Sequence, residues 1–166
     1  AGQGHEADAR SDVYALGAIG YELLSGKLPH PRLSSSTLFE AVDIVGEGGR
    51  IECDCDGTLT ATESCWVNDN RNPGKTRGQI ERELLREYGA KKMIWVPGLR
   101  DRDITDDHID ATSRFVEPGV VMVQVPPRNR DDVWAKDARQ QLRILSRATD
   151  ARGRRLDVIE MVFDGA

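Results

Sequence analysis

The feature that most constrains the fold is a change of pattern near residue 42, after which short strand-like segments alternate with amphipathic helical ones. The first two of these segments, residues 50–55 and 58–62, are separated by the dipeptide Asp56-Gly57. Asp-Gly readily supplies the positive φ angles that tight hairpin turns require. The two segments are therefore expected to form a β-hairpin.

Helices and further strands are expected downstream of this hairpin. Thr76 and Gln79 form a capping-box pattern ahead of a helix that ends near residue 88, and apolar residues at helical spacing mark a second helix over residues 134–145. Strand-like runs occupy residues 93–96, 120–125 and 156–163. The order is strand, strand, helix, strand, then strand, helix, strand. This order predicts the α/β fold class, and the recurrence of strands with one helix indicates a repeated supersecondary unit.

Residues 1–42 have a different character. Ser11 and Asp12 can cap a helix, residues 13–24 are apolar nearly all round, and Gly26 stands where a helix C-terminus is expected. A helix that is apolar on every side requires burial on every side. We therefore expect two parts, a helical segment at residues 1–42 and an α/β domain at residues 43–166.

Charge and cysteine content exclude several classes of protein. A net charge of -5 argues against a dedicated binder of nucleic acid or of an anionic membrane, since both need a basic surface. The longest apolar stretch is shorter than the roughly 20 residues that span a bilayer. Three cysteines, Cys53, Cys55 and Cys65, are too few and odd in number for a disulfide framework. A cytoplasmic protein with no nucleic-acid or membrane partner is expected.

Two clusters could be mistaken for metal sites. The acidic run at residues 103–110 resembles a calcium loop, but His108 occupies the sixth position, where glycine is needed, and the twelfth position lacks glutamate. Cys53 and Cys55 supply only two ligands and Cys65 a third, so alternation along one face of a strand is the preferred interpretation. No metal and no cofactor are expected.

A segment of the first part resembles a known family. The string HEADARSDVYALGAIGYELLSGKLP, residues 5–29, is similar to the C-lobe of bacterial serine/threonine protein kinases, in which Asp12 would organise the catalytic loop. Kinase chemistry also needs a glycine-rich loop, a phosphate-binding lysine and a catalytic aspartate with Mg²⁺ ligands. The sequence contains none of these motifs. A degenerate kinase fragment therefore stays as one alternative.

The second part resembles a different family over a much longer range. The strings EGGRIECDCDGTLTATESCWVNDNRNPG (47–74), MIWVPGLRDRDITDDHIDATSRFVEPGVVMVQV (93–125) and DARGRRLDVIEM (150–161) carry this resemblance. They are similar to the agmatine deiminase branch of the pentein superfamily, also described as the Porphyromonas-type peptidylarginine deiminase family. The resemblance implies a partial pentein, an α/β propeller represented by about two ββαβ units. It also implies hydrolysis of the guanidinium of agmatine to carbamoylputrescine and ammonia, in putrescine biosynthesis.

The resemblance assigns roles to three residues. The family reaction needs an activated sulfur, a proton carrier, and carboxylates that hold the planar guanidinium. His108 matches the general acid/base, Asp110 a guanidinium-binding carboxylate, and Glu47 the glutamate that orients the histidine. Next to Glu47, Gly48 and Gly49 would allow the backbone to approach the site closely.

The resemblance also implies that the set is incomplete. The family nucleophile is a cysteine in an Ile-His-Cys context that does not occur before Ala166, and Cys65 matches a position that is not the nucleophile. A second guanidinium-binding aspartate is missing as well. Asp107 stands where many relatives have glycine. We expect the chain alone to lack activity, and a non-catalytic guanidinium-binding or scaffold module is the alternative. Exposed strand edges would then favour self-association.

Overall fold

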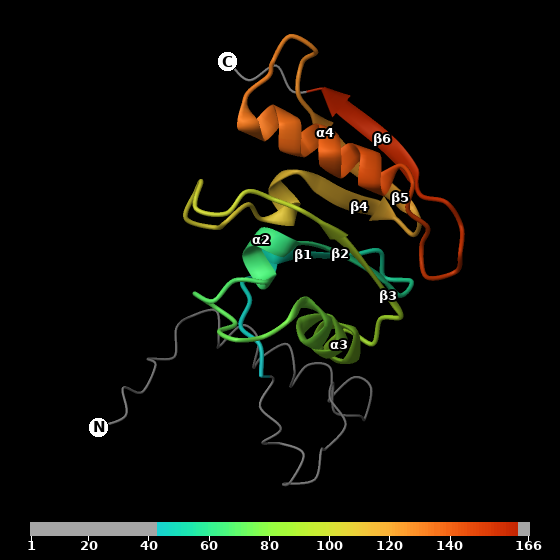
Figure 1. Ribbon diagram of the computed structural model, residues 1–166. Helices are drawn as coiled ribbons and strands as arrows, with labels where there is room; N and C mark the ends of the chain where they lie inside the picture. Colours follow the sequence, from blue (N-terminus) through green and yellow to red (C-terminus); the bar gives the residue numbers. More distant parts are fainter. Residues whose placement is uncertain (1–42, 163–166) are drawn as a thin grey trace, which may run out of the picture. The chain divides into compact units, whose positions relative to one another are not determined.

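A computed structural model describes residues 43–162 of the chain (Figure 1), all within one compact unit that spans Val42–Ala166. The helix expected at residues 13–24, and with it the segment at residues 1–42, lies outside the described residues. No helix between residues 43 and 162 is long and apolar enough to cross a membrane.

The first half of the described chain forms a three-stranded sheet with one long helix. The strands are β1 (Ile51–Cys53), β2 (Thr58–Thr62) and β3 (Lys92–Val96), and α3 (Arg77–Glu87) connects β2 to β3. β2 lies in the centre of the sheet, antiparallel to β1 and parallel to β3. The expected hairpin is confirmed, and its turn places Gly57 at a φ of +100°.

The second half repeats this arrangement. It contains β4 (Ser113–Glu117), β5 (Val120–Val125), α4 (Val133–Leu145) and β6 (Asp157–Val162). β5 is central, antiparallel to β4 and parallel to β6. The described chain therefore consists of two ββαβ units, as the recurrence in the sequence indicated. β4 was not predicted, because most of its residues are exposed and show no alternation of apolar and polar residues.

Local side-chain contacts fix where the two long helices begin. At the start of α3, the Thr76 backbone N–H donates to Gln79 Oε1 at 2.9 Å, which completes the capping box expected from the sequence. At the start of α4, the Ala135 N–H donates to Asp132 Oδ1 at 2.8 Å.

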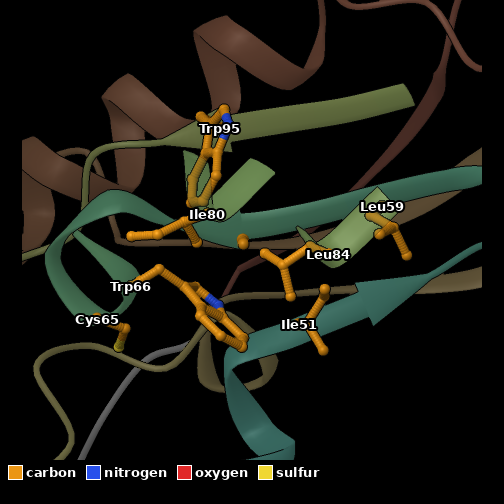
Figure 2. Packing of buried hydrophobic residues seen from close by; sticks show 8 residues of the cluster. Ile51, Leu59, Cys65, Trp66, Ile80, Leu84 and Trp95 are labelled. Atoms are coloured by element: carbon orange, nitrogen blue, oxygen red, sulfur yellow. The ribbon is translucent and has the colours of Figure 1, made fainter. Parts of the chain in front are cut away.

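Strand β3 takes part in both hydrophobic cores. Figure 2 shows the first core, in which Ile80 and Leu84 of α3 pack with Trp66 and with Trp95 of β3. Ile94 and Val96 of β3 belong instead to the second core, with residues of β5, α4 and the loop before β4. Successive side chains of a strand point to opposite faces, so one strand joins the two units.

The loop between β3 and β4 is anchored to a short helix, α2 (Glu63–Trp66), and to the residue before it. Thr62 Oγ1 donates to the Asp107 carbonyl at 2.7 Å, and Ser64 Oγ donates to the Asp106 carbonyl at 2.6 Å. The loop ends in a 3₁₀ turn, η2 (Ile109–Ala111), which contacts a second 3₁₀ turn, η1 (Gly48–Arg50), ahead of β1. These two turns carry the residues that the sequence assigned to the site.

Candidate active site

Glu47, His108 and Asp110 converge around Gly49. His108 Nε2 lies 3.5 Å from Glu47 Oε2. An added Cβ at Gly49 would lie 2.7 Å from both His108 Nδ1 and Asp110 Oδ2, so only glycine leaves room for the two side chains. By contrast, a Cβ at Gly48 would meet no atom within 4 Å. The structure thus brings the three sequence-predicted residues together and shows which glycine permits the contact.

Two arginines hold the Glu47 carboxylate. Arg50 is fully buried and pairs through Nη2 with Glu47 Oε2. Its Nη1 donates to the Val45 carbonyl at 3.2 Å, and its guanidinium lies 5.7 Å from the centre of the Trp66 ring. Arg71 Nε donates to Glu47 Oε1 at 3.3 Å. Both oxygens of this carboxylate therefore face a cation.

Cys65 holds the backbone of the loop that carries His108. Its Sγ lies 2.9, 3.1 and 3.3 Å from the carbonyl oxygens of Thr105, Asp106 and Asp107, which share its single S–H donor. The side chain is completely buried, and burial raises the pKa of the thiol. Reactive cysteines are accessible and have a lowered pKa. Cys65 therefore has the character of a structural residue.

The Asp106 carboxylate ties the same loop to its neighbours. Its Oδ1 accepts from the Asp101 N–H at 2.8 Å, while Oδ2 accepts from Asn68 Nδ2 at 3.0 Å and from Arg71 Nη1. Burial alone would raise the pKa of Asp106, but these hydrogen bonds and the Arg71 charge keep it below its usual value. Arg71 thus links Asp106 to Glu47.

Asp107 combines a left-handed backbone conformation with a buried carboxylate. Its φ is +70°, in the left-handed region that glycine adopts without strain and that aspartate tolerates. The side chain is buried, and Oδ2 accepts from the Leu99 N–H at 3.0 Å. Burial, and then the nearby Asp137 carboxylate, raise the pKa of Asp107 to about 7. Near neutral pH this pair of acids therefore holds a proton.

His108 is mostly in its neutral form at neutral pH. Burial lowers the pKa of its imidazole, and the positive charges of Arg50 and Arg71 lower it further against the opposing effect of Asp110. Its Nε2 is buried and makes no hydrogen bond within the described residues. A neutral imidazole can accept a proton, as a general base must.

Asp110 is in contact with the guanidinium of an arginine in this chain. Arg114 Nη2 donates to Asp110 Oδ2 at 3.4 Å, and Arg114 Nε lies 3.7 Å from Glu52 Oε1. The Arg114 side chain is mostly exposed, whereas burial raises the pKa of Glu52. Asp110 and Arg114 also border a small pocket of about 90 Å³ together with Gln124 and Met161. Asp110 thus already contacts a guanidinium, the chemical group expected in its ligand.

A larger pocket of about 230 Å³ is bordered by Asp107, Asp137, Thr112 and Trp134. Between residues 43 and 162, no three His, Cys, Asp or Glu side chains are grouped so as to hold a metal ion. The expectation that Cys53 and Cys55 alternate on one strand face is wrong, because β1 ends at Cys53 and Cys55 turns to a φ of +58°.

Sequence reasoning missed the residues that hold Glu47 in place. Arg50 directly follows the Glu-Gly-Gly motif, but an isolated arginine is normally expected at the surface. Arg71 lies within the string 47–74 that carries the resemblance, which assigned it no role. Their position in the sequence could have indicated a role at the site, because both arginines lie in or beside motifs that carry the resemblance.

The fold defined by the two ββαβ units is that of the agmatine deiminases. The agmatine deiminase of Enterococcus faecalis superposes with a TM-score of 0.68 and 30% sequence identity, over 72% of this chain and 33% of that chain. The match places the chain among mixed α/β proteins built from small sheets.

The chain belongs to the Porphyromonas-type peptidyl-arginine deiminase family, whose sequence profile matches residues 22–164. It is 38% identical to the agmatine deiminase of Medicago truncatula over 136 residues, 81% of this chain and 34% of that protein. It is also 38% identical to the agmatine deiminase of Pseudomonas aeruginosa (strain LESB58) over 74% of this chain and 33% of that protein. The chain thus spans about a third of the length of these relatives.

The family match begins inside the segment for which a kinase-like lobe was expected. These comparisons give the kinase resemblance of residues 1–42 no support.

Proposed function

We propose that this chain carries part of the active site of an enzyme that hydrolyses the guanidinium of agmatine, giving carbamoylputrescine and ammonia. The observation that carries the proposal is the convergence of Glu47, His108 and Asp110 around Gly49, within a fold shared with agmatine deiminases. These are an acid/base, a carboxylate beside it and a second carboxylate, the groups that guanidinium chemistry needs.

In this proposal each residue has a distinct task. Asp110 accepts hydrogen bonds from the guanidinium N–H groups, as it does now from Arg114. In its neutral form His108 accepts the proton of the nucleophile that bonds to the guanidinium carbon, and it returns this proton to the leaving nitrogen as the C–N bond breaks and ammonia leaves. Glu47, at 3.5 Å, orients the imidazole and stabilises its protonated form.

The nucleophile is the part that these residues do not supply. Cys65 is buried and holds a loop. Cys53 and Cys55 lie at the hairpin turn, at the end of β1 away from η1 and Glu47. We therefore propose that the chain by itself binds the guanidinium without turning it over, because loss of a nucleophile costs several orders of magnitude in rate.

A non-catalytic guanidinium-binding module is the second candidate. The contact between the Arg114 guanidinium and Asp110 favours it, since Asp110, with Glu52 nearby, already accepts a hydrogen bond from a guanidinium. A place in putrescine biosynthesis belongs to the first proposal and rests on the sequence resemblance, whereas the proposed cytoplasmic location rests on the cysteine content.

Self-association is proposed from the second sheet. Ile159, Met161 and Val162 of the edge strand β6 and Val116 of β4 are exposed apolar residues. An exposed apolar edge strand is a template for pairing with another chain. Sedimentation velocity should show dimers or larger species that grow with concentration, and a monomer at all concentrations would refute this part.

Calorimetry and an ammonia assay test the function. Agmatine should bind to the wild-type chain, whereas putrescine, which lacks the guanidinium, should not, and Asp110→Asn should abolish the agmatine signal. Ammonia release should not exceed that of His108→Ala. Absence of agmatine binding would refute both candidates, while turnover that depends on His108 would show that the chain supplies its own nucleophile.

A further inference from the structure

Two positively polarised groups approach the same oxygen atom of Glu47. Arg50 Nη2 pairs with Oε2, and His108 Nε2 lies 3.5 Å from that same atom. The guanidinium carries a permanent charge, whereas the imidazole is charged only when protonated. The two groups therefore compete for one carboxylate.

Arg50 is held in this position from three sides. Its side chain is fully buried, its guanidinium lies over Trp66, and its Nη1 donates to the Val45 carbonyl. The Trp66 ring also contacts Gly46, where an added Cβ would lie 2.2 Å from the ring. Arg50 thus cannot move away from Glu47 without disturbing a packed segment.

From this shared oxygen we infer that Arg50 is a positioning residue that fixes the Glu47 carboxylate and keeps His108 in its neutral, proton-accepting form. The role given to His108 rests on the proposed function, but the competition for Glu47 does not. Without the Arg50 charge, Glu47 would stabilise the imidazolium more strongly than it does in the wild type.

The other charged groups that face His108 belong to three further segments. Arg71 lies ahead of α3, Asp103 lies in the loop before His108, and Asp110 lies in η2. Burial and the arginines lower the pKa of His108, and the two aspartates raise it. Arg71 also pairs with Asp106, so its charge is partly offset. Arg50 forms an ion pair with Glu47 alone among residues 43–162, although the Asp106 charge also acts on it.

Arg77 offers a control for the pairing of arginine with tryptophan and glutamate. Its guanidinium lies 5.6 Å from the centre of the Trp95 ring and pairs with Glu63, and Arg77 is not among the charges that act on His108. Arg77 is half-exposed whereas Arg50 is fully buried, so replacing Arg50 is expected to cost more stability. If the role of Arg50 were purely structural, variants at both positions would leave the titration of His108 unchanged.

The test is an NMR titration of the histidine side chains. The chain has three histidines, so the His108 signals can be assigned with His108→Ala. Arg50→Met retains packing on Trp66, and Arg50→Gln retains a donor for Val45, so at least one neutral variant is expected to fold. Neither variant leaves a buried carboxylate without a charged partner, because the Glu47 side chain is 53% exposed.

We expect the pKa of His108 to rise in Arg50→Met and Arg50→Gln, and to return toward the wild-type value in Arg50→Lys, which restores the charge. Arg77→Met should leave it unchanged. An unchanged or lower pKa in the folded neutral variants would overturn the inference. The titration uses no ligand, so its outcome tests the role of Arg50 alone. A failure of agmatine binding would instead count against the proposed function.

Discussion

The backbone of Gly49 lies so close to the imidazole of His108 that a Cβ at residue 49 would be 2.7 Å from Nδ1. The same Cβ would be 2.7 Å from Asp110 Oδ2. Gly49 is therefore the point at which the turn before β1 meets His108 and Asp110, the proposed acid/base and guanidinium-binding carboxylate. The absence of a side chain there is a requirement of the site.

Gly49→Ala should displace both side chains. The added methyl group overfills a packed region, so we expect a loss of about 1–3 kcal/mol in the free energy of unfolding and weaker agmatine binding. Gly48→Ala is the control, because its methyl group would meet no atom within 4 Å. Denaturant unfolding and calorimetry check both variants. Equal behaviour of the two alanine variants would contradict the geometry.

The raised pKa of Asp107 predicts that stability depends on pH. Because burial and Asp137 raise the pKa to about 7, the folded chain holds a proton that the unfolded chain releases above about pH 4. This contribution is fully present below about pH 4 and is lost as the pH rises through 7. Asp107→Asn, which tolerates the positive φ, should therefore be more stable than the wild type at pH 8 but not at pH 4.

Asp101→Asn is the control for this effect. Asp101 is also in the left-handed region, at a φ of +59°, but its side chain is exposed. Its replacement should leave the pH profile of the melting temperature unchanged. If Asp107→Asn is no more stable than the wild type at pH 8, the pH dependence of stability does not arise from Asp107.

The three cysteines should differ in reactivity. Cys55 is exposed, Cys53 is half-buried, and Cys65 is fully buried with its Sγ on three carbonyls. Iodoacetamide, followed by peptide mass spectrometry, should label Cys55 first and Cys65 only when the chain unfolds. Rapid labelling of Cys65 in the native chain would mean that this thiol is accessible and activated.

Removal of the Arg114 guanidinium should strengthen agmatine binding. Arg114 occupies the Asp110 carboxylate, so a ligand guanidinium has to displace it. Arg114→Ala is expected to lower the dissociation constant for agmatine several-fold, and Arg128→Ala, at another exposed arginine, should have no effect. Weaker binding in Arg114→Ala would instead make Arg114 part of the ligand site.

Much of the fold could be predicted from local sequence signals. Asp56-Gly57 marked the hairpin, and Thr76 with Gln79 marked the start of α3, because both patterns act through contacts of a few neighbouring residues. β4 escaped prediction because its order depends on pairing with β5 rather than on its own pattern. Local signals thus identify turns and caps better than strands that rely on a partner.

The sequence predicted which residues form the candidate site but not the residues that hold them in place. The resemblance named Glu47, His108 and Asp110, and the structure brings them together. The buried position of Arg50 and the raised pKa of Asp107 both arise from packing between segments distant in the sequence. The spacing of residues along the sequence does not reveal such packing, so neither feature could be predicted from it.

The central claim is that His108 and Asp110 form a site for a guanidinium, and NMR of the His108 side chain during agmatine addition tests it most directly. Even a dissociation constant in the millimolar range, about -4 kcal/mol, would be detectable. We predict that agmatine shifts the His108 signals in the wild type, that putrescine does not, and that Asp110→Asn abolishes the effect. Unchanged His108 signals at saturating agmatine, or equal shifts with putrescine, would contradict the account.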